Sequence, residues 1–243
     1  RRSAPDPLAG MVNILRGIFG KKTPETPRRD VKGLSAGLAV PAVQVVMTDD
    51  ASLSHLGGLP CLPNTLGWPE RDGKRLDFLA RLSLASIHDA HAIDWLPRSG
   101  ALLFFYDLDR QPWGFDPSDR GGAAVLHVPD LSAPTKQSES GSDTSGTLPH
   151  RSVSFRRIDV FPSLEREQVQ ALELTDAESD AYSDLADSVF GDAGKHQIGG
   201  LPSPVQGDEM ELECQLVTNG LYCGDPSGYK DPRAASLEPG ATD

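Results

Sequence analysis

Long apolar runs are missing from this sequence of 243 residues. A helix that crosses a bilayer needs about 20 consecutive apolar residues, and no stretch of the chain approaches that length. The first ten residues are polar and contain proline, and no small-residue cleavage site follows an apolar stretch, so they do not resemble a secretory signal. The sequence predicts a protein without a transmembrane segment, and we expect it to be cytoplasmic.

Basic residues are also scarce, because 23 Lys and Arg stand against 35 Asp and Glu, which gives a formal net charge of −12. Proteins that bind nucleic acids gain much of their affinity from Lys and Arg that neutralise phosphates. Weak basic clusters occur at residues 16–22, 28–32 and 156–157, and we interpret them as solvated surface. The composition of this acidic chain predicts no nucleic-acid partner.

Cysteine occurs three times, as Cys61, Cys214 and Cys223, with no Cys-x-x-Cys motif and no even set for disulfides. Cys214 lies in residues 210–216, where apolar and polar residues alternate, and this alternation predicts a strand. Its thiol would then share the buried face with Leu212 and Leu216, as a small core hydrophobe. This usage fits a reducing compartment.

The rest of the composition is that of a globular protein, with 38% hydrophobic and 24% charged residues. We assign residues 1–29 to a leader and linker and residues 30–243 to a single domain. Two related halves, at about 30–130 and 151–243, make up the domain. The Ser-, Gly- and Pro-rich segment 131–150 joins the halves as a flexible connection.

Hydrophobic periodicity predicts five strands, at residues 43–47, 76–84, 101–107, 123–128 and 152–160. The second strand is expected to carry one apolar face, formed by Leu76, Phe78, Ala80 and Leu82. Helices are predicted at 86–96, 164–174 and 175–190, and a capping box from Thr175 to Glu178 opens the last one. Strands come first and last with helices grouped between them, which predicts an α+β fold with a mostly antiparallel sheet.

An internal repeat is the most informative feature. His55-Leu-Gly-Gly-Leu-Pro60 returns as His196-Gln-Ile-Gly-Gly-Leu-Pro202, and the two copies differ by one residue between the histidine and the glycines. Each copy leads into a predicted strand, at 76–82 and 210–216, which favours two halves related by approximate two-fold symmetry. Gly-Gly-Leu-Pro itself predicts a tight turn, and it lacks the sequence context of a phosphate-binding loop.

Several ordered segments carry a resemblance to a known family. They are His55-Leu-Gly-Gly-Leu-Pro60, Leu66-Gly-Trp-Pro69, Leu103-Phe-Phe-Tyr-Asp107, Trp113-Gly-Phe-Asp-Pro117, Asp119-Arg-Gly-Gly122 and Asn219-Gly-Leu-Tyr-Cys-Gly224. With them, the chain resembles the YwqG-like family of bacterial proteins from about residue 43 to 233. The resemblance implies an α+β fold with antiparallel sheet and an internal duplication. It implies no catalytic residues, because the function of that family is uncharacterised.

The two repeated histidines have two interpretations. His55 and His196 could face each other as an acid–base pair or as metal ligands, or each imidazole could cap the backbone of its own turn. A metal would need further ligands at diagnostic spacing, and the sequence shows none. We therefore predict no metal and no cofactor.

The segment 113–122 is a candidate ligand loop, because it places Trp113, Asp116, Asp119 and Arg120 close together. A structural interpretation is equally open, in which Arg120 pairs with one of the two aspartates while the aromatic rings fill the core. Cys223 lies in a glycine-bracketed turn, where a thiolate nucleophile would need a histidine as its base.

Two functional hypotheses follow. The first is a non-catalytic binding or interaction module for a protein partner or a small polar ligand, with a cleft between the duplicated halves. The second is a hydrolase that uses His55 or His196 with Asp116 or Cys223, which requires these groups within about 3 Å of each other. The predicted cleft residues are His55, Trp68, Trp113, Asp116, Asp119, Arg120, His196, Tyr222 and Cys223.

Overall fold

The structure is a computed structural model that describes residues 27–132, 135–137, 147–202 and 210–237. Most of the predicted leader and of the predicted flexible connection lies outside these residues. The described chain combines helices with a large antiparallel sheet, so the predicted α+β class is confirmed. No helix in these ranges has the length and apolar character that crossing a membrane requires.

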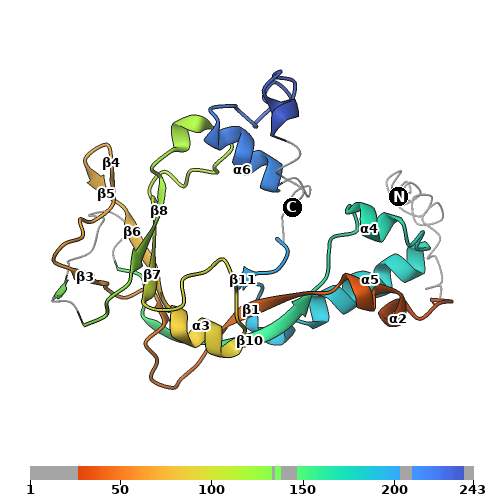
Figure 1. The fold of residues 1–243 in the computed structure, drawn as a ribbon, viewed down its shortest axis with the longest axis horizontal. Coiled ribbons are helices and arrows are strands. Elements are labelled where there is room, and N and C mark those ends of the chain that lie inside the picture. Colours follow the sequence, from red (N-terminus) through yellow and green to blue (C-terminus); the bar gives the residue numbers. More distant parts are fainter. Residues whose placement is uncertain (1–26, 133–134, 138–146, 203–209, 238–243) are drawn as a thin grey trace, which may run out of the picture.

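Seven strands form a single curled sheet in the order β11-β1-β10-β2-β6-β7-β8, and every neighbouring pair is antiparallel (Figure 1). β1 pairs with β10 along its whole length, and β6, β7 and β8 rise at the left of the view. In chain order the strands are β1 (Val40–Met47), β2 (His55–Leu56), β6 (Asp77–Ser83), β7 (Ala101–Tyr106), β8 (Ala123–Val128), β10 (Arg151–Val160) and β11 (Gln197–Gly199). The five predicted strands all belong to this sheet.

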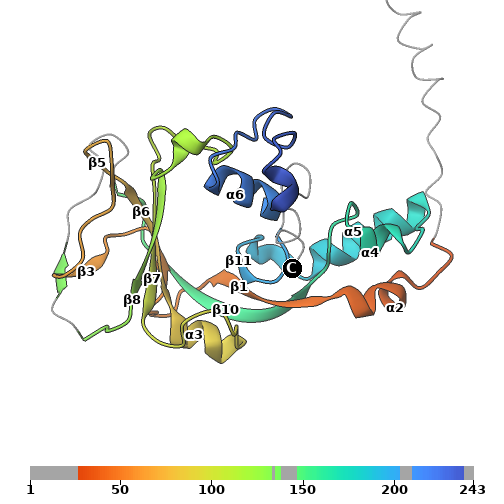
Figure 2. The same cartoon turned by 45° about the horizontal axis from the view of Figure 1, so that its top comes forward.

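Two small sheets lie beside the β6–β8 end of the large one (Figures 1 and 2). β3 (Cys61–Pro63) pairs with β9 (Thr135–Gln137), and β4 (Glu70–Arg71) pairs with β5 (Lys74–Arg75). Both involve the chain between β2 and β6, which covers the outer face of β6 and β7. Trp68 and Leu62 from this segment pack there against a core that includes Phe105.

Five helices accompany the sheet in the described residues. They are α2 (Val31–Ser35), α3 (Leu84–Ala90), α4 (Glu167–Gln170), α5 (Asp176–Ser188) and α6 (Met210–Thr218). The predicted capping box is present, because the Thr175 hydroxyl and the Glu178 carboxylate each accept a hydrogen bond from the other residue's backbone. The helix predicted at 164–174 is much shorter, since Arg166 is extended at one end and Glu173 has a φ of 48° at the other.

The segment 210–216 is a helix, so the predicted second-copy strand is wrong. Leu212 and Leu216 still pack together in one apolar cluster, because positions i and i+4 share a face in a helix as they do in a strand. Cys214 lies halfway between them and is exposed, since in a helix it points away from that face. Met, Glu, Leu and Gln all favour helix, and this intrinsic preference prevails over the alternation. The internal duplication beyond the turns stays a prediction.

The alternation of side chains between the two faces of the sheet is interrupted partway along β6. Phe78 pairs with Phe105 of β7, whereas Ala80 pairs with Phe104, so a β-bulge shifts the register at Leu79. One extra residue moves every later side chain to the other side of the sheet, and Phe78 and Ala80 accordingly belong to different core clusters. The prediction that this strand carries a single apolar face, formed by Leu76, Phe78, Ala80 and Leu82, is therefore wrong.

At the other end of the sheet, α5 is tied to the start of the described chain. Arg29 donates hydrogen bonds from its side chain to both carboxylate oxygens of Glu178 and to the carbonyl oxygens of Leu172 and Glu173. Glu178 is only 1% exposed, and these bonds lower its pKa to about 2. Tyr182 of the same helix is buried and donates a hydrogen bond to the Pro162 carbonyl.

Candidate functional site

The two repeated motifs form similar turns in the structure. Gly57 and Gly58 have φ values of 59° and 73°, and Gly199 and Gly200 have values of 68° and 71°. Glycine takes this left-handed conformation at little cost, whereas other residues do not. The predicted role of Gly-Gly-Leu-Pro as a tight turn is therefore confirmed in both copies.

His55 caps its own turn. Its Nδ1 lies 2.9 Å from the carbonyl oxygen of Gly57 and donates to it, which is one of the two interpretations that the sequence leaves open. The ring is half-buried and stacks on His150, with centroids 4.5 Å apart. Burial lowers the pKa of His55, and the charges of His150 and Arg81 lower it further.

His196 lies far from His55 in the sheet. Its side chain is exposed, and its carbonyl oxygen accepts a hydrogen bond from the Val45 amide. β1 and β10 separate β11 from β2, and three strand spacings correspond to roughly 14 Å. The two imidazoles therefore do not form an acid–base pair in this structure.

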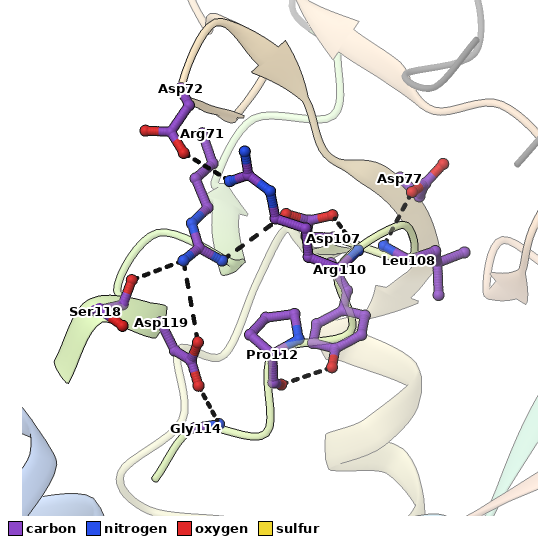
Figure 3. A network of polar contacts seen from close by, with 11 residues as sticks. Arg71, Asp72, Asp77, Asp107, Leu108, Arg110, Pro112, Gly114, Ser118 and Asp119 are labelled. Atoms are coloured by element: carbon purple, nitrogen blue, oxygen red, sulfur yellow. Dashed lines mark hydrogen bonds and ion pairs between the residues drawn. The ribbon is translucent and has the colours of Figure 1, made fainter. Parts of the chain in front are cut away.

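The candidate loop between β7 and β8 is held by a residue outside it. Figure 3 shows Arg71 of β4 reaching into the loop, where its guanidinium donates to the Ser118 carbonyl at 2.6 Å. The same guanidinium lies 3.8 Å from an oxygen of Asp107 and 4.0 Å from one of Asp119. The expectation that Arg120 pairs with Asp116 or Asp119 is thus wrong, because Arg71 occupies that position at Asp119.

Further bonds fix the backbone of this loop. The Asp119 carboxylate accepts a hydrogen bond from the Gly114 amide at 3.0 Å, and the Tyr106 hydroxyl donates to the Pro112 carbonyl at 2.7 Å. The Asp116 carboxylate accepts from the Ser118 amide, which lowers the pKa of Asp116. Hydrogen bonds therefore hold the backbone of this loop at several points.

The aromatic residues of the loop do not fill the core, contrary to the structural interpretation. Trp113 is 85% exposed and Phe115 is 39% exposed. The Phe115 ring meets the Tyr222 ring edge-on, with centroids 5.7 Å apart, and the Phe115 carbonyl accepts a hydrogen bond from the Cys223 amide. These contacts join the loop to the chain that follows α6.

A cavity of about 350 Å³ lies at this junction. The loop contributes Asp116, Asp119 and Arg120, and the end of α6 contributes Val217 and Thr218. Its walls thus come from both predicted halves of the domain. Three of the nine predicted cleft residues line this cavity, namely Asp116, Asp119 and Arg120, and Tyr222 and Cys223 contact Phe115 of the same loop.

Trp68 has a structural role apart from this junction. Its ring packs edge-on against Phe105 at 5.3 Å between centroids, and its indole nitrogen donates to the Leu76 carbonyl at 2.7 Å. Arg75 lies over the other part of the ring. Trp68 therefore anchors the covering segment onto β7.

Cys223 is not arranged as a nucleophile. Its Sγ lies 3.8 Å from the Leu221 carbonyl oxygen and 4.0 Å from that of Glu213. Burial raises the pKa of the Cys223 thiol, and the charge of Glu213 adds to the effect, so the reactive thiolate is disfavoured. The described residues contain no group of three side chains that could hold a metal ion.

Sequence reasoning missed Arg71, which organises the loop from 36 positions before Asp107. One local signal points to it. Asp72-Gly73 between charged residues is typical of a two-residue hairpin turn, and the structure has this hairpin as β4 and β5. Such a signal places Arg71 on a strand, but it does not say which loop the side chain reaches.

Comparison with known proteins places these features in one family. No curated protein matches the sequence. A family model described as a domain of unknown function, DUF1963, matches residues 54–234. The match covers most of the chain and includes both turns, the β7–β8 loop and α6. The chain belongs to the DUF1963 family, a family of uncharacterised function.

Proposed function

We propose that this chain is a non-catalytic binding module that contacts a protein partner through Trp113, Phe115 and Tyr222, which we call the aromatic surface. The observation that carries the proposal is the 85% exposure of Trp113 on a loop whose backbone is fixed. Tryptophan and tyrosine are among the residues that contribute most to protein interfaces. A large aromatic ring left in water costs free energy that a partner recovers by covering it.

The fixed loop supports this proposal further. Arg71, Asp119 and Asp116 bond to the loop backbone at several points, so little conformational entropy is lost when a partner binds. The same loop also lines a cavity of about 350 Å³ through Asp116, Asp119 and Arg120, and this cavity is large enough to accept a partner's side chain. A preformed surface next to a pocket is the usual form of an interface centre.

The hydrolase alternative finds less support. It needs His55 or His196 within hydrogen-bond reach of Asp116 or Cys223. Within the described residues, the cavity that Asp116 lines includes neither histidine, and the cavity that His55 lines includes neither Asp116 nor Cys223. The aromatic surface is therefore the better basis for a function.

Affinity capture tests the proposal. The full chain, its Trp113→Ala variant and its Trp95→Ala variant are immobilised, and proteins retained from an extract of the source organism are quantified by mass spectrometry. Trp95 is a matched control because it is 71% exposed but lies outside the aromatic surface. We expect at least one protein to be retained by the wild-type and Trp95→Ala chains and lost with Trp113→Ala.

The retained protein is then purified and its affinity measured by calorimetry. Trp113→Ala is expected to weaken binding by about 2 kcal/mol, roughly thirtyfold, without lowering the melting temperature, since the ring is exposed. The proposal fails if all three chains retain the same proteins, or if Trp95→Ala and Trp113→Ala weaken binding equally.

A further inference from the structure

A second cavity, of about 290 Å³, lies at the first Gly-Gly-Leu-Pro turn and away from the aromatic surface. His55 of β2 and Arg81 of β6 line it, together with apolar side chains from the turn and from β7 and β8. The apolar ones used below are Leu59, Leu103 and Val128. No role has been given so far to Arg81, which lies in the alternating strand that follows the first turn.

The β-bulge brings Arg81 to this cavity. Arg81 is the direct cross-strand neighbour of His55 on β2 and of Leu103 on β7, so all three side chains share one face of the sheet. Without the extra residue at Leu79, Arg81 would lie on the opposite face. The bulge is itself fixed by the turn, because the Leu79 carbonyl accepts a hydrogen bond from the Gly57 amide at 2.7 Å.

Arg81 is the permanent cation among the residues that line this cavity. Arg81 donates one hydrogen bond to the Leu53 carbonyl, and within the described residues it forms no ion pair. His150 stacks on His55. Because a carbonyl oxygen only accepts, the His55 Nδ1 carries a proton, and its Nε2 is the atom that gains one when the ring becomes charged.

One acidic residue also lines the cavity. Asp130 follows β8, and one of its carboxylate oxygens accepts hydrogen bonds from the amide and hydroxyl of Ser132 at 2.8 and 2.7 Å. These bonds direct that oxygen to its own turn. Its negative charge lies at the same cavity as Arg81.

We propose that this cavity binds a small organic anion, with its acidic group against Arg81 and His55 and its apolar body against Leu59, Leu103 and Val128. Arginine presents a planar set of donors that matches a carboxylate. The apolar lining excludes water from the contact, which strengthens the attraction between the charges. The volume admits a short branched or aromatic acid and no large cofactor.

Binding of such an anion is coupled to protonation. In the free protein, the burial of the His55 ring and the nearby His150 and Arg81 all disfavour the charged form of His55. A bound anion offsets that effect. Affinity is therefore expected to rise as the pH falls from 8 to 6. His150, which precedes β10, and Arg81 of β6 face His55, and Asp130 and Cys61 are the other titratable residues that line the cavity.

The experiment is a titration of the full chain with 4-methylpentanoate, followed by NMR and calorimetry. The controls are its neutral isostere 4-methylpentanamide and inorganic phosphate, which lacks an apolar body. We expect saturable binding of the acid with a Kd below about 1 mM, shifts in the resonances of His55, no binding of the amide, and weaker binding of phosphate. Failure of the acid to bind, or equal binding of the amide or of phosphate, overturns the proposal.

Three variants sharpen the result. Arg81→Gln should weaken binding of the acid about tenfold, and Asp130→Asn should tighten it about threefold, since removing a nearby negative charge favours an anion. Arg151→Gln is the matched control, because Arg151 is paired with Leu56 and so lies on the other face of the same strands. A similar loss with Arg151→Gln, or no loss with a folded Arg81→Gln, overturns the proposal.

His55→Gln gives a readout that a structural role would not change. Glutamine does not titrate, so this variant should lose most of the increase in affinity between pH 8 and pH 6. Thermal denaturation of each variant shows that the chain is folded under the conditions of the titration. An unchanged pH dependence in folded His55→Gln contradicts the assignment of His55 as the protonated partner.

Discussion

The two Gly-Gly-Leu-Pro turns share their backbone conformation but not their surroundings. An added Cβ on Gly57 of the first turn would lie 2.3 Å from the Pro149 carbonyl oxygen, whereas one on Gly200 of the second would lie 2.6 Å from the Ala42 side chain. The first turn thus packs against backbone and borders the cavity that Arg81 lines, and the second packs against side chains of β1 and β10 and borders a different cavity, of about 420 Å³. The same local sequence sets the turn, and the neighbouring strands decide what the turn is next to.

The neighbouring strands also decide which histidine is available for chemistry. β2 lies beside β10 and β6, so His55 meets His150 and Arg81. β11 lies at the edge of the sheet beside β1 alone, so His196 remains exposed. A repeated motif is therefore weak support for a repeated function, and the following predictions test how different the two copies are.

The largest effect is expected from Gly57→Ala. The new methyl group would overlap backbone oxygen atoms that cannot move separately, and alanine is strained at a φ of 59°. We expect a loss of about 3 kcal/mol in the free energy of unfolding, measured by urea denaturation. Gly200→Ala should cost somewhat less, because the nearest atoms to its added Cβ, the Ala42 Cβ at 2.6 Å and a Val160 methyl group at 2.8 Å, lie farther away than the Pro149 oxygen does from that of Gly57 at 2.3 Å.

Gly73→Ala is the control for both. Gly73 has a φ of 74° but no atom within 4 Å of an added Cβ, so it measures the backbone strain alone, which is about 1 kcal/mol. Equal losses in Gly57→Ala and Gly73→Ala would show that the first turn is not tightly packed.

The two ends of the sheet should also respond oppositely to acid. The Arg29 guanidinium holds the pKa of Glu178, in α5, at about 2, so the stabilisation that this carboxylate gives is present above pH 4.5 and is lost as the pH falls toward 2. Burial raises the pKa of Asp77 in β6, so its contribution favours the folded state at low pH and is lost as the pH rises through its folded pKa.

Denaturation curves between pH 2 and pH 7 measure both effects. In Glu178→Gln, the free energy of unfolding should fall less on acidification than it does in the wild type. In Asp77→Asn, the difference in free energy of unfolding from the wild type should be more favourable at pH 7 than at pH 3. A Glu178→Gln variant with the wild-type pH dependence would show that the Arg29 contact adds nothing in solution.

The smallest effects are expected from the histidines themselves. His55→Ala removes the hydrogen bond to Gly57 and the contact with His150, and we expect a cost of about 1 kcal/mol. His196→Ala removes an exposed side chain and should change stability by less than about 0.5 kcal/mol. Thermal melts of the two variants give the comparison directly, and equal costs would mean that the two copies are more alike than their surroundings indicate.

Much of the fold follows from local pattern, whereas the site does not. β7 and β8 are predicted within a residue, since a continuous apolar run and an alternating one leave few alternatives, and the Thr175 capping box marks the start of α5. Residues 210–216 fit both a strand and a helix, because Leu212 and Leu216 share a face in either. The helix preference of the residues in this segment and the packing of α6 on Leu221 and Ala234 together decide between them.

The site depends on contacts between distant parts of the chain. The segment 113–122 could be chosen from its composition, but its fixation by Arg71 and its contact with Cys223 arise from tertiary packing. The bulge at Leu79 is likewise invisible in a regular alternation of apolar and polar residues. It moves Arg81 to the face of His55, and for this reason the second cavity has no signature in the sequence.

The exposure of Trp113 has a practical consequence. Trp68 is packed against Phe105, and Trp113 and Trp95 are largely in water. In a Trp95→Phe background, an aqueous quencher would reduce the emission of Trp113 while Trp68 stays shielded until the chain unfolds. The protein thus contains its own pair of fluorescent reporters, one for contact at its surface and one for the integrity of its core.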